Sequence, residues 1–446
     1  MSNVKFVVQP GGSVKGRIRV PGDKSISHRS IMMGALAEGI TTVTGFLEGA
    51  DALATLQAFR EMGVHIEGPE KGKVTIHGVG LRGLKKPNKP LDMGNSGTST
   101  RLLAGIIAGQ SFDCTLIGDA SLSTRPMKRV TDPLALMGVD IETDPGGTLP
   151  MTIKGSGQAL KAIDYALPMA SAQVKSCVLL AGLFADGKTC ALEPAPTRDH
   201  TERMLNGFGY KVSSTQLEGH KMKACLQGGG TLTGRHIDVP SDISSAAFFM
   251  AAAAVSKGSD LVIEHVGMNP TRTGVVDILK LMGANIELEN AHEVGGEPVA
   301  DVHIKYAPLK GIKIPEALVP LAIDEFPVLF VVAANAQGQT LLTGAEELRV
   351  KESDRIQVMV DALQALGVDA TATQDGMVIN GGDQSKQNAP ILSHHDHRIS
   401  MAMTIAGLNA VSEVMIDDCA NVNTSFPVFL ELINQVGMKV KSLEEH

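Results

Sequence analysis

The sequence has no tryptophan and only three tyrosines among its 446 residues, and aromatic residues make up 3% of the chain. Aromatic side chains are the platforms on which single-stranded nucleic acids stack. The formal net charge of −8 also repels a phosphate backbone. These two features argue against a nucleic-acid-binding protein.

Long apolar runs are also missing. The longest run, Ala246 to Val255, is about half of what a helix needs to cross a bilayer, and it predicts a buried helix. Residues 1–20 contain neither an apolar signal core nor an Arg/Ser-rich transit pattern, so we expect a cytoplasmic protein. A precursor trimmed of a targeting segment would have the same sequence.

Cysteines are few and scattered: there are five, and no two form a C-x-x-C pair. This pattern predicts reduced thiols in a reducing compartment. We interpret Cys177, in an apolar helical pattern, and Cys114, in a strand-like stretch, as small buried side chains. The densest histidine group, His394 to His397, could hold a metal in principle, but adjacent loop residues rarely converge on one ion. We therefore expect no metal site.

The sequence does contain a sixfold repeat. Six apolar, Ala/Gly-rich helical patterns each open on a short polar cluster, and successive clusters begin 71 to 82 residues apart. A second series of six pairs, each an apolar residue followed by Gly, marks the end of another helical stretch. A repeat of this period indicates one supersecondary unit used six times. The clusters begin at Lys24, Gly97, Ser171, Asp242, Asp324 and Asp396, and the pairs end at Gly63, Gly138, Gly209, Gly283, Gly367 and Gly437.

The six repeats form two homologous halves. Residues 21–67 and 240–287 both begin with Pro, place Asp two residues later, and finish with Met-Gly and an Ile-Glu strand. A chain of this length also exceeds one ordinary core. We therefore expect an α/β protein with domains at 21–239 and 240–446, while the strand-like residues 1–20 could pair with either half.

The first cluster combines positive charge with a helix start. Lys24 and Arg29 lie near the positive end of a helix that Ser25 or Ser27 is expected to cap. Two cations there repel each other and the helix dipole, and an anionic ligand removes the conflict. The fourth repeat has Asp242 and two serines at the same place, which is the pattern of plain capping. The comparison predicts an anion site at the first helix.

Further clusters in the first half could also bind anions. The segment Gly94 to Arg101 is a glycine turn into a helix, but it is neither a Walker loop nor a nucleophile elbow, and a plain turn explains it equally well. Arg125 and Arg129 offer planar forks suited to bidentate binding of oxyanions. The segment Ser171 to Ser176 offers hydroxyl and amide donors at another helix start.

The second half adds carboxylates. Asp324 and its neighbour Glu325 precede a long apolar helix, which either of them could cap. Lys351 and Arg355 are predicted to share a helix face at i, i+4, with Glu352 beside them, and an exposed ion-pair helix is the plain alternative. If the helix starts of both halves lie on one side, the clusters meet in one cleft. Such a cleft would close over an anionic ligand, because the ligand removes the repulsion between its cations.

Eight motifs occur in order across nearly all of the chain: PGDKSISHR, GNSGTSTR, RPMKR, SAQVKS, TRDHTER, IDEFP, VKESDR and DHRIS. Together they resemble the 5-enolpyruvylshikimate-3-phosphate (EPSP) synthase family, in particular its class II bacterial subgroup. The resemblance implies a two-domain inverse α/β barrel of six βαβαββ-type repeats, with residues 1–20 completing the C-terminal domain and the active site in the interdomain cleft. It implies transfer of the enolpyruvyl group of phosphoenolpyruvate to the 5-hydroxyl of shikimate 3-phosphate through a tetrahedral intermediate. Phosphate is released without a metal or cofactor, in the shikimate pathway to chorismate and the aromatic amino acids.

The resemblance also assigns the site residues. Asp324 would take the proton from the attacking hydroxyl, with Glu325 left open as the alternative base, and Glu352 would protonate the methylene carbon. Lys24 counts among the catalytic residues. Shikimate 3-phosphate, on the N-terminal side, would contact Lys24, Ser25, Arg29, Ser171, Ala172, Gln173, Arg198, Asp324 and Lys351. Phosphoenolpyruvate, on the C-terminal side, would contact Lys24, Gly97, Arg125, Gln173, Lys351, Arg355 and Arg398.

Two departures and two alternatives bear on this assignment. Many relatives have Ala at the position of Ser96, a difference that we expect to be tolerated. Class I enzymes carry a phosphate-contacting Lys at the position of Thr424, and this contact is missing here. Gly97 stands where some glyphosate-tolerant class II relatives carry Ala, so we expect glyphosate to inhibit this protein. We also expect the protein to be a monomer. The family of UDP-N-acetylglucosamine enolpyruvyl transferases would have Lys-Asn at the first cluster and a loop cysteine, and this chain has neither. A non-catalytic anion-binding repeat protein would leave Asp324 and Glu352 unexplained.

Overall fold

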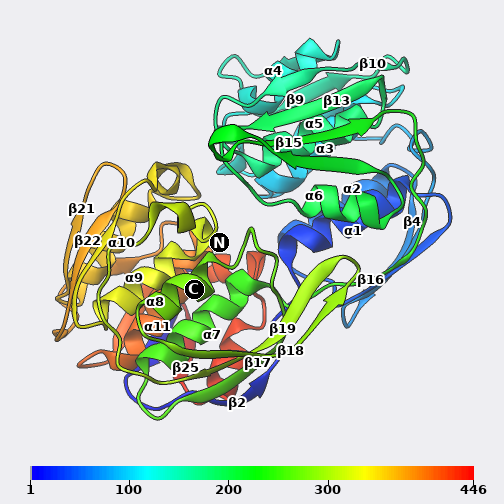
Figure 1. Ribbon diagram of the computed structural model, residues 1–446. Helices are drawn as coiled ribbons and strands as arrows, with labels where there is room; N and C mark the ends of the chain where they lie inside the picture. The colour runs from blue at the N-terminus through cyan, green and yellow to red at the C-terminus, as the bar shows by residue number, and fades with distance from the viewer. Residues whose placement is uncertain (1–2, 446) are drawn as a thin grey trace. The chain divides into compact units, whose positions relative to one another are not determined.

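The computed structural model describes residues 3–445, which divide into two compact units. Residues 22–239 form one, called here the central unit, and the described residues before 22 and after 239 form the other, the terminal unit. Each unit has its own buried hydrophobic cluster. Both units are α/β, which confirms the predicted fold class (Figure 1). Between residues 3 and 445 no helix is long and apolar enough to span a membrane.

The first helix of each repeat begins at its predicted polar cluster and is almost entirely buried. All 13 residues of the fourth such helix are buried, which confirms the prediction for Ala246 to Val255. In the terminal unit α7, α9 and α11 pack against one another (Figure 1). These six helices are α1 (Lys24–Leu36), α3 (Gly97–Ala108), α5 (Ala172–Gly182), α7 (Ile243–Val255), α9 (Phe326–Ala334) and α11 (His397–Ala406).

The second helix of each repeat ends at its predicted glycine. Gly63 and Gly437, for example, have φ angles of 87° and 116°, which place them in the left-handed region that glycine adopts without penalty. A glycine in this conformation ends a helix and turns the chain into the next strand. These helices are α2 (Ala50–Glu61), α4 (Lys128–Leu136), α6 (His200–Gly207), α8 (Gly274–Leu281), α10 (Arg355–Ala365) and α12 (Phe429–Gln435).

The central unit contains three sheets of one design. In each, the first strand pairs in parallel with the second, and the remaining pairs are antiparallel. The first has the order β16 (His236–Asp238), β3 (Ile40–Thr44), β5 (Lys73–His77), β4 (His65–Glu70). The second has the order β6 (Leu91–Asp92), β7 (Cys114–Ile117), β9 (Met151–Lys154), β8 (Asp140–Thr143). The third has the order β11 (Asp164–Ala166), β13 (Lys188–Glu193), β15 (Met222–Gln227), β14 (Val212–Gln216), and a small sheet pairs β10 (Leu160–Lys161) with β12 (Ala185–Asp186).

The terminal unit repeats this design. In its three-stranded sheet, an isolated parallel bridge between Lys313 and Leu341 stands where the other sheets have their first strand. Within residues 3–445 no sheet closes on itself into a barrel. The orders are β2 (Lys15–Ile18), β17 (Asp260–Gly267), β19 (Glu297–Lys305), β18 (Asn285–Val294); β20 (Gly338–Leu342), β22 (Met377–Gly381), β21 (Asp369–Ala372); and β23 (Ile391–Leu392), β24 (Val414–Asp417), β1 (Asn3–Gln9), β25 (Lys439–Glu445).

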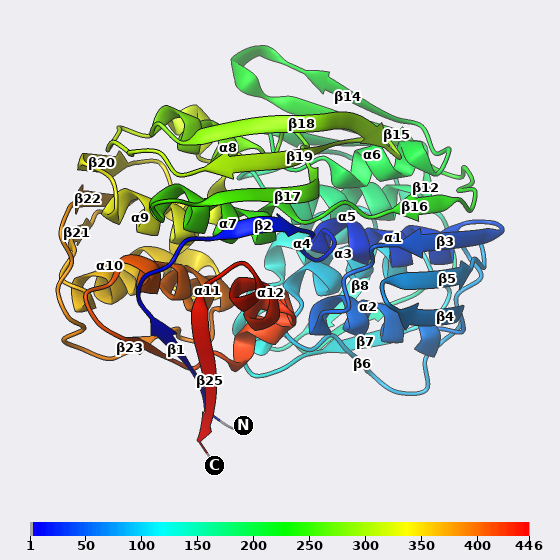
Figure 2. The ribbon, with the colours of Figure 1, turned by 90° about the horizontal axis from the view of Figure 1, so that it is seen from below.

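Two strands pair away from the helix that follows them in the chain. Strand β2 precedes α1 in the chain, yet it pairs with β17 of the terminal unit. Strand β16 precedes α7, yet it pairs with β3 of the central unit. Strand β1 pairs with β24 and β25 near the chain ends (Figure 2). Both strands before residue 20 therefore lie in the terminal unit, a choice that the sequence pattern left open.

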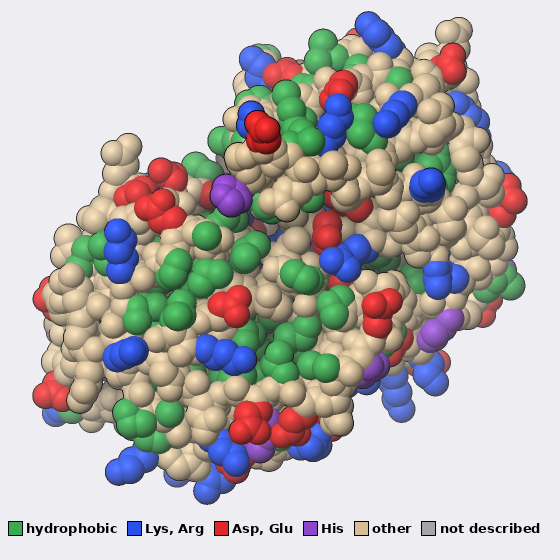
Figure 3. Space-filling model, viewed as in Figure 1, with side chains coloured by type: hydrophobic (Ala, Val, Ile, Leu, Met, Phe, Trp, Pro, Cys, Tyr) green, Lys and Arg blue, Asp and Glu red, His purple; other side chains and the backbone are tan. Residues whose placement is uncertain are grey.

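The charged side chains are mixed on the surface. On the face drawn in Figure 3, Lys and Arg side chains are scattered among Asp and Glu side chains. The drawn face therefore carries no broad basic surface for a nucleic acid, in keeping with the net charge of −8.

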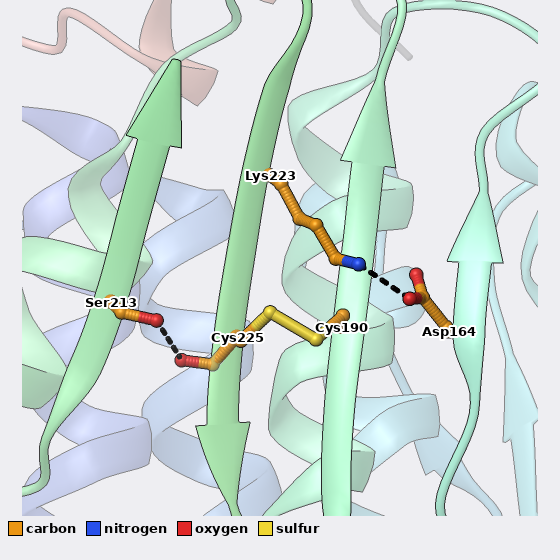
Figure 4. The surroundings of a disulfide bond; sticks show 5 residues. All are labelled: Asp164, Cys190, Ser213, Lys223 and Cys225. Atoms are coloured by element: carbon orange, nitrogen blue, oxygen red, sulfur yellow. Dashed lines mark hydrogen bonds and ion pairs between the residues drawn. A yellow bond between two sulfur atoms is a disulfide. The ribbon is translucent and has the colours of Figure 1, made fainter. Parts of the chain in front are cut away.

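Two of the cysteines form a disulfide, so the prediction of reduced thiols is wrong for them. Cys190 on β13 lies opposite Cys225 on β15, with Cα atoms 4.1 Å apart (Figure 4). The two lie 35 residues apart in the sequence, and only the sheet register brings them together. Cys114, Cys177 and Cys419 are free and buried, as predicted for the first two. Burial raises the pKa of each of these three thiols to about 12.

Candidate functional site

The starts of three buried helices meet in the central unit. The ring Nδ1 of His28 on α1 lies 3.1 Å from Ser99 Oγ on α3. From α5, Gln173 Nε2 donates to Thr98 Oγ1 of α3 at 3.0 Å. The structure therefore brings together the first three polar clusters of the sequence, which lie more than 70 residues apart.

The first helix is capped by an acid. The prediction of Ser25 or Ser27 as the cap is wrong, because Asp23 accepts a hydrogen bond from the backbone N–H of Ile26 at 2.8 Å. Lys24 forms an ion pair with Asp51 of α2. The helix start therefore has carboxylates close to its cation, and these stabilise the site electrostatically before any ligand binds.

Arg29 lies behind this helix start and is 4% exposed. It donates to the carbonyl of Ser25 at 3.0 Å, to Ser176 Oγ of α5 at 3.1 Å and to Thr201 Oγ1 of α6 at 2.7 Å. Burial, together with the nearby charges of Lys24 and Arg29, lowers the pKa of His28 to about 3. His28 is therefore neutral at physiological pH, while Arg29 holds three helices together.

The start of α3 lies against two guanidinium groups. Ser96 caps α3, and a Cβ atom added at Gly97 would lie 3.2 Å from Arg125 Nη1 and 3.4 Å from Arg101 Nη1. Arg125 Nη2 donates to Asn95 Oδ1 at 2.7 Å, which fixes its direction. Cationic forks beside a helix N-terminus are suited to binding a carboxylate or phosphate. Arg101 ends the GNSGTSTR motif, but the sequence alone assigned it no role.

The start of α5 presents polar groups, as expected. Ser171 caps the helix by accepting from the N–H of Val174 at 3.4 Å, and Ala172 is its first residue. Gln173 accepts from Arg101 and donates to α3, so α5 contributes its first turn to the same cluster as Gly97.

Arg198 lies two residues before α6 and is half-buried. Asp199 occupies the N-cap position of α6, but its side chain makes no capping hydrogen bond. Its carboxylate instead pairs with Arg203 at 2.9 Å, one turn further along.

A buried charge cluster behind α5 was missed by sequence reasoning. Lys175 is 1% exposed, and its Nζ lies 2.9 Å from Glu193 Oε2 and 2.8 Å from Glu202 Oε1. Burial works to lower the pKa of Lys175, but the two carboxylates outweigh it and raise the pKa, while burial raises the pKa of Glu193. A lysine inside an apolar helix signals such partners, because a buried charge is stable only when paired. Thr197, next to Arg198, donates to Glu193 and ties the Arg198 loop to the cluster.

In the terminal unit, Arg355 is bonded to three carboxylates. It begins α10, is 1% exposed, and lies 3.2 Å from Asp324, 2.7 Å from Glu352 and 2.8 Å from Asp396. Burial opposes its charge, but the carboxylates prevail and raise the pKa of the guanidinium. Asp396, from the histidine-rich segment, also caps α11. Arg355 therefore fixes the positions of both candidate catalytic carboxylates.

Lys351 reaches the same place from a loop. The prediction that Lys351 and Arg355 share a helix face is wrong, because Asp354 caps α10 and the helix begins only at Arg355. Lys351 Nζ lies 3.4 Å from Asp324 Oδ1 and 2.6 Å from Glu347 Oε1. Burial alone would lower the pKa of Lys351, but these two carboxylates raise it. The cation is therefore held in its charged form beside Asp324.

The two acids before α9 have different surroundings. Both lie in a short 3-10 turn (Ile323–Glu325), and Glu325, at the N-cap position of α9, makes no capping hydrogen bond with its side chain. The Glu325 side chain is 1% exposed and accepts from Ser244 of α7, whereas the Asp324 side chain is 14% exposed. Arg398 Nη1 donates to the carbonyl of Asp324 at 3.2 Å. Asp324 is therefore the more accessible acid, and Glu325 connects two buried helix starts.

Comparison with known proteins agrees with these features. The family model of EPSP synthase (3-phosphoshikimate 1-carboxyvinyltransferase) matches residues 8–433. A relative named 3-phosphoshikimate 1-carboxyvinyltransferase, from Hydrogenovibrio crunogenus, is 73% identical over 443 residues, 99% of each chain. One of the same name from Alkalilimnicola ehrlichii is 65% identical over 435 residues, 98% of this chain and 96% of that relative.

Solved structures agree as well. The structure of EPSP synthase from Acinetobacter baumannii matches with a TM-score of 0.88 and 59% identity, covering 99% of this chain and 100% of that one. The enolpyruvyl transferase NikO from Streptomyces tendae matches over the full length of both chains with a TM-score of 0.78 but 14% identity, so it supports the fold alone. The chain belongs to the EPSP synthase family.

Proposed function

We propose that the protein is a 3-phosphoshikimate 1-carboxyvinyltransferase, which transfers the enolpyruvyl group of phosphoenolpyruvate to the 5-hydroxyl of shikimate 3-phosphate and releases phosphate. Its full-length identity to relatives of that name carries the proposal. The reaction belongs to the shikimate pathway and leads through chorismate to the aromatic amino acids. The structural observation that agrees best is the group of two carboxylates held by Arg355 beside Lys351.

The chemistry needs an acid and a base. Lys351 and Arg355 favour the ionised form of Asp324, which is the form a base requires to take the hydroxyl proton. Glu352 is 28% exposed, so it can take a proton from solvent once an anionic substrate nearby favours its neutral form.

Proton transfer from Glu352 to the methylene carbon leaves a cationic carbon that the 5-oxygen attacks. The tetrahedral product then loses phosphate and returns one methyl proton to the Glu352 carboxylate, which forms the enol ether of the product. Preorganised cations stabilise the charge that builds on the leaving phosphate.

We propose that both units contribute to one active site in the cleft between the domains at 21–239 and at 1–20 plus 240–446. The first domain would mainly bind shikimate 3-phosphate, through Ser25, Arg29, Ser171, Gln173 and Arg198. The second would mainly bind phosphoenolpyruvate. Lys24, Gly97 and Arg125 of the first domain would also contact this substrate. Clustered cations favour closure only when an anion is present, so small-angle scattering should show a smaller radius of gyration with both substrates than without. Unchanged dimensions would count against this arrangement.

Three finer properties belong to the same proposal. Glyphosate inhibits the enzyme, because Gly97 leaves room beside the two guanidinium groups. The enzyme is a monomer, which light scattering of the purified protein tests. It works in the cytoplasm, where fractionation of the source cells should locate it.

The deciding experiment measures phosphate release from phosphoenolpyruvate with each of several acceptors. Release with shikimate 3-phosphate, and its loss in Asp324→Asn and Glu352→Gln, is the expected result. Release with UDP-N-acetylglucosamine but not with shikimate 3-phosphate would identify a UDP-N-acetylglucosamine enolpyruvyl transferase. Binding of both anions without any release would indicate a non-catalytic protein.

A further inference from the structure

The outer face of the hairpin formed by β4 and β5 carries a group of metal-ligating side chains away from the proposed active site. His65 on β4 lies directly opposite His77 on β5, and Glu67 follows His65 by two residues on the same face. His65 and Glu67 are exposed, and His77 is partly exposed. Their strand neighbours Ile66 and Ile76 are buried in the core. Because side chains alternate along a strand, His65, Glu67 and His77 point outward.

The three side chains converge. Glu67 Oε1 lies 2.8 Å from His77 Nε2 and 3.4 Å from His65 Nε2. The two imidazole rings have their centroids 4.8 Å apart. One atom from each side chain, both Nε2 atoms and a carboxylate oxygen, lies within 4.8 Å of the others. Two rings thus present the same nitrogen to one oxygen, across a hairpin rather than along a flexible loop.

We propose that His65, Glu67 and His77 form a surface site for a divalent transition metal ion of the Zn²⁺ class. Two imidazoles and one carboxylate are a donor set that zinc accepts, with bonds of about 2.1 Å. Donors around a tetrahedral ion of that size lie about 3.4 Å apart. Small rotations of exposed side chains reach this spacing, and the fourth position stays open to water.

The strand that carries two of the ligands is held from behind. Arg60 of α2 donates to the carbonyl of Ile66 at 2.8 Å and to the carbonyl of Gly68 at 2.5 Å. These bonds fix the β4 backbone on both sides of Glu67. Ligands on fixed strands lose less freedom on binding a metal than ligands on loops.

A second cluster of similar composition makes a natural control. Glu287 and Glu289 on β18 lie near His303 on β19. Here both ring nitrogens are occupied, since Nδ1 lies 2.8 Å from Glu289 and Nε2 lies 2.7 Å from Asp260. Hydrogen bonds to these carboxylates raise the pKa of His303 and favour the imidazolium form, which has no lone pair for a metal. The first cluster is therefore the metal site and the second is not.

Calorimetric titration of the full-length, chelator-treated protein with Zn²⁺ tests the proposal. We expect one ion per chain, and we expect His77→Ala and Glu67→Gln each to weaken binding by about 100-fold, because loss of a supporting group alone costs 10- to 100-fold. His303→Ala, from the second cluster, should bind like the wild type. Cys114, Cys177 and Cys419 are buried and offer no competing ligand.

A second measurement reports geometry. Co²⁺ in place of Zn²⁺ should give visible absorption bands of tetrahedral intensity in the wild type and in His303→Ala, but not in His77→Ala. Unfolding temperatures without metal check that the variants fold. Equal Zn²⁺ affinity in the wild type and His77→Ala, no binding to the wild type, or loss of binding in His303→Ala would each overturn the proposal.

Discussion

Lys175 Nζ lies 2.9 Å from Glu193 Oε2, and both side chains are almost completely buried. The pair joins α5 to β13, and Glu202 at 2.8 Å adds α6 to the cluster. Glu193 also accepts from Thr197, the neighbour of Arg198. The cluster therefore supports two of the segments of the central unit that the family resemblance assigns to shikimate 3-phosphate, the start of α5 and the loop with Arg198.

Removing the lysine charge should destabilise the protein. In Lys175→Met two buried carboxylates lose their partner, which costs about 3–5 kcal/mol of unfolding free energy. Denaturant unfolding measures this loss, and Lys188→Met, at an exposed position of β13, should change it by less than about 0.5 kcal/mol. We also expect the KM for shikimate 3-phosphate to rise more than that for phosphoenolpyruvate. A Lys175→Met variant as stable as the wild type would show that the pair is not structural.

The two acids before α9 should separate catalysis from stability. Asp324→Asn is expected to lower kcat by about 10²- to 10⁴-fold, because we propose that this side chain acts as the base. Its effect on stability should be smaller than that of Glu325→Gln, because Arg355 keeps two other carboxylate partners. Glu325→Gln disturbs a buried contact to Ser244, so its main effect should be on the unfolding free energy. Phosphate-release kinetics and urea unfolding on the same samples distinguish the two. A larger loss of kcat in Glu325→Gln than in Asp324→Asn would assign the base to Glu325.

Gly97→Ala should weaken inhibition by glyphosate. The new methyl group would lie 3.2 Å from Arg125 Nη1, so the guanidinium must move by a few tenths of an ångström. An inhibitor that fills the space beside it loses more affinity than a smaller substrate, and we expect a rise of about tenfold in the inhibition constant relative to the KM for phosphoenolpyruvate. Gly382→Ala, where an added Cβ meets nothing within 4 Å, is the control. Equal changes in both constants would mean that Gly97 does not discriminate between them.

The contribution of His303 to stability should depend on pH. Hydrogen bonds to Asp260 and Glu289 raise the pKa of His303 above 6.5, and the hydrogen bond from His303 lowers the pKa of Asp260 below 3.8. The histidine contribution is therefore complete below pH 6.5 and is lost as the pH rises through the raised value. The aspartate contribution is present above pH 3.8 and is lost as the pH falls through the lowered value.

His303→Gln should consequently be less stable than the wild type at about pH 5.5 and nearly as stable at about pH 9. Thermal unfolding across this range measures the difference, with Glu287 and Lys305 as the other charged groups nearby. A difference that does not change with pH would refute a role for the imidazolium.

Local signals in the sequence were enough to find the helices. Glycines such as Gly63 and Gly437 end helices because of their own backbone freedom, and the polar clusters mark helix starts for similarly local reasons. Choices among neighbouring residues were harder. Asp23 rather than Ser25 caps α1, and Asp354 caps α10, so that Lys351 lies outside the helix. Capping depends on backbone angles that cannot be inferred from the sequence alone.

Long-range pairing could not be predicted. The Cys190–Cys225 disulfide depends on the register of β13 and β15, and the partners of Lys175 come from two other elements. Likewise Lys351 and Arg355 meet at Asp324 because a loop and a helix start converge, not because of their spacing.

The pairing of β2 and β16 has a consequence for synthesis on the ribosome. The central unit has all its strands once β16 has emerged, so it can fold while later segments are still being made. Strands β1 and β2 of the terminal unit must stay unpaired through that time. The partner of β2, β17, is translated only after the central unit, and the partners of β1, β24 and β25, are translated near the end of the chain. Nascent chains should therefore acquire protease resistance in two steps, with residues 22–239 protected before residues 3–21 and 240–445.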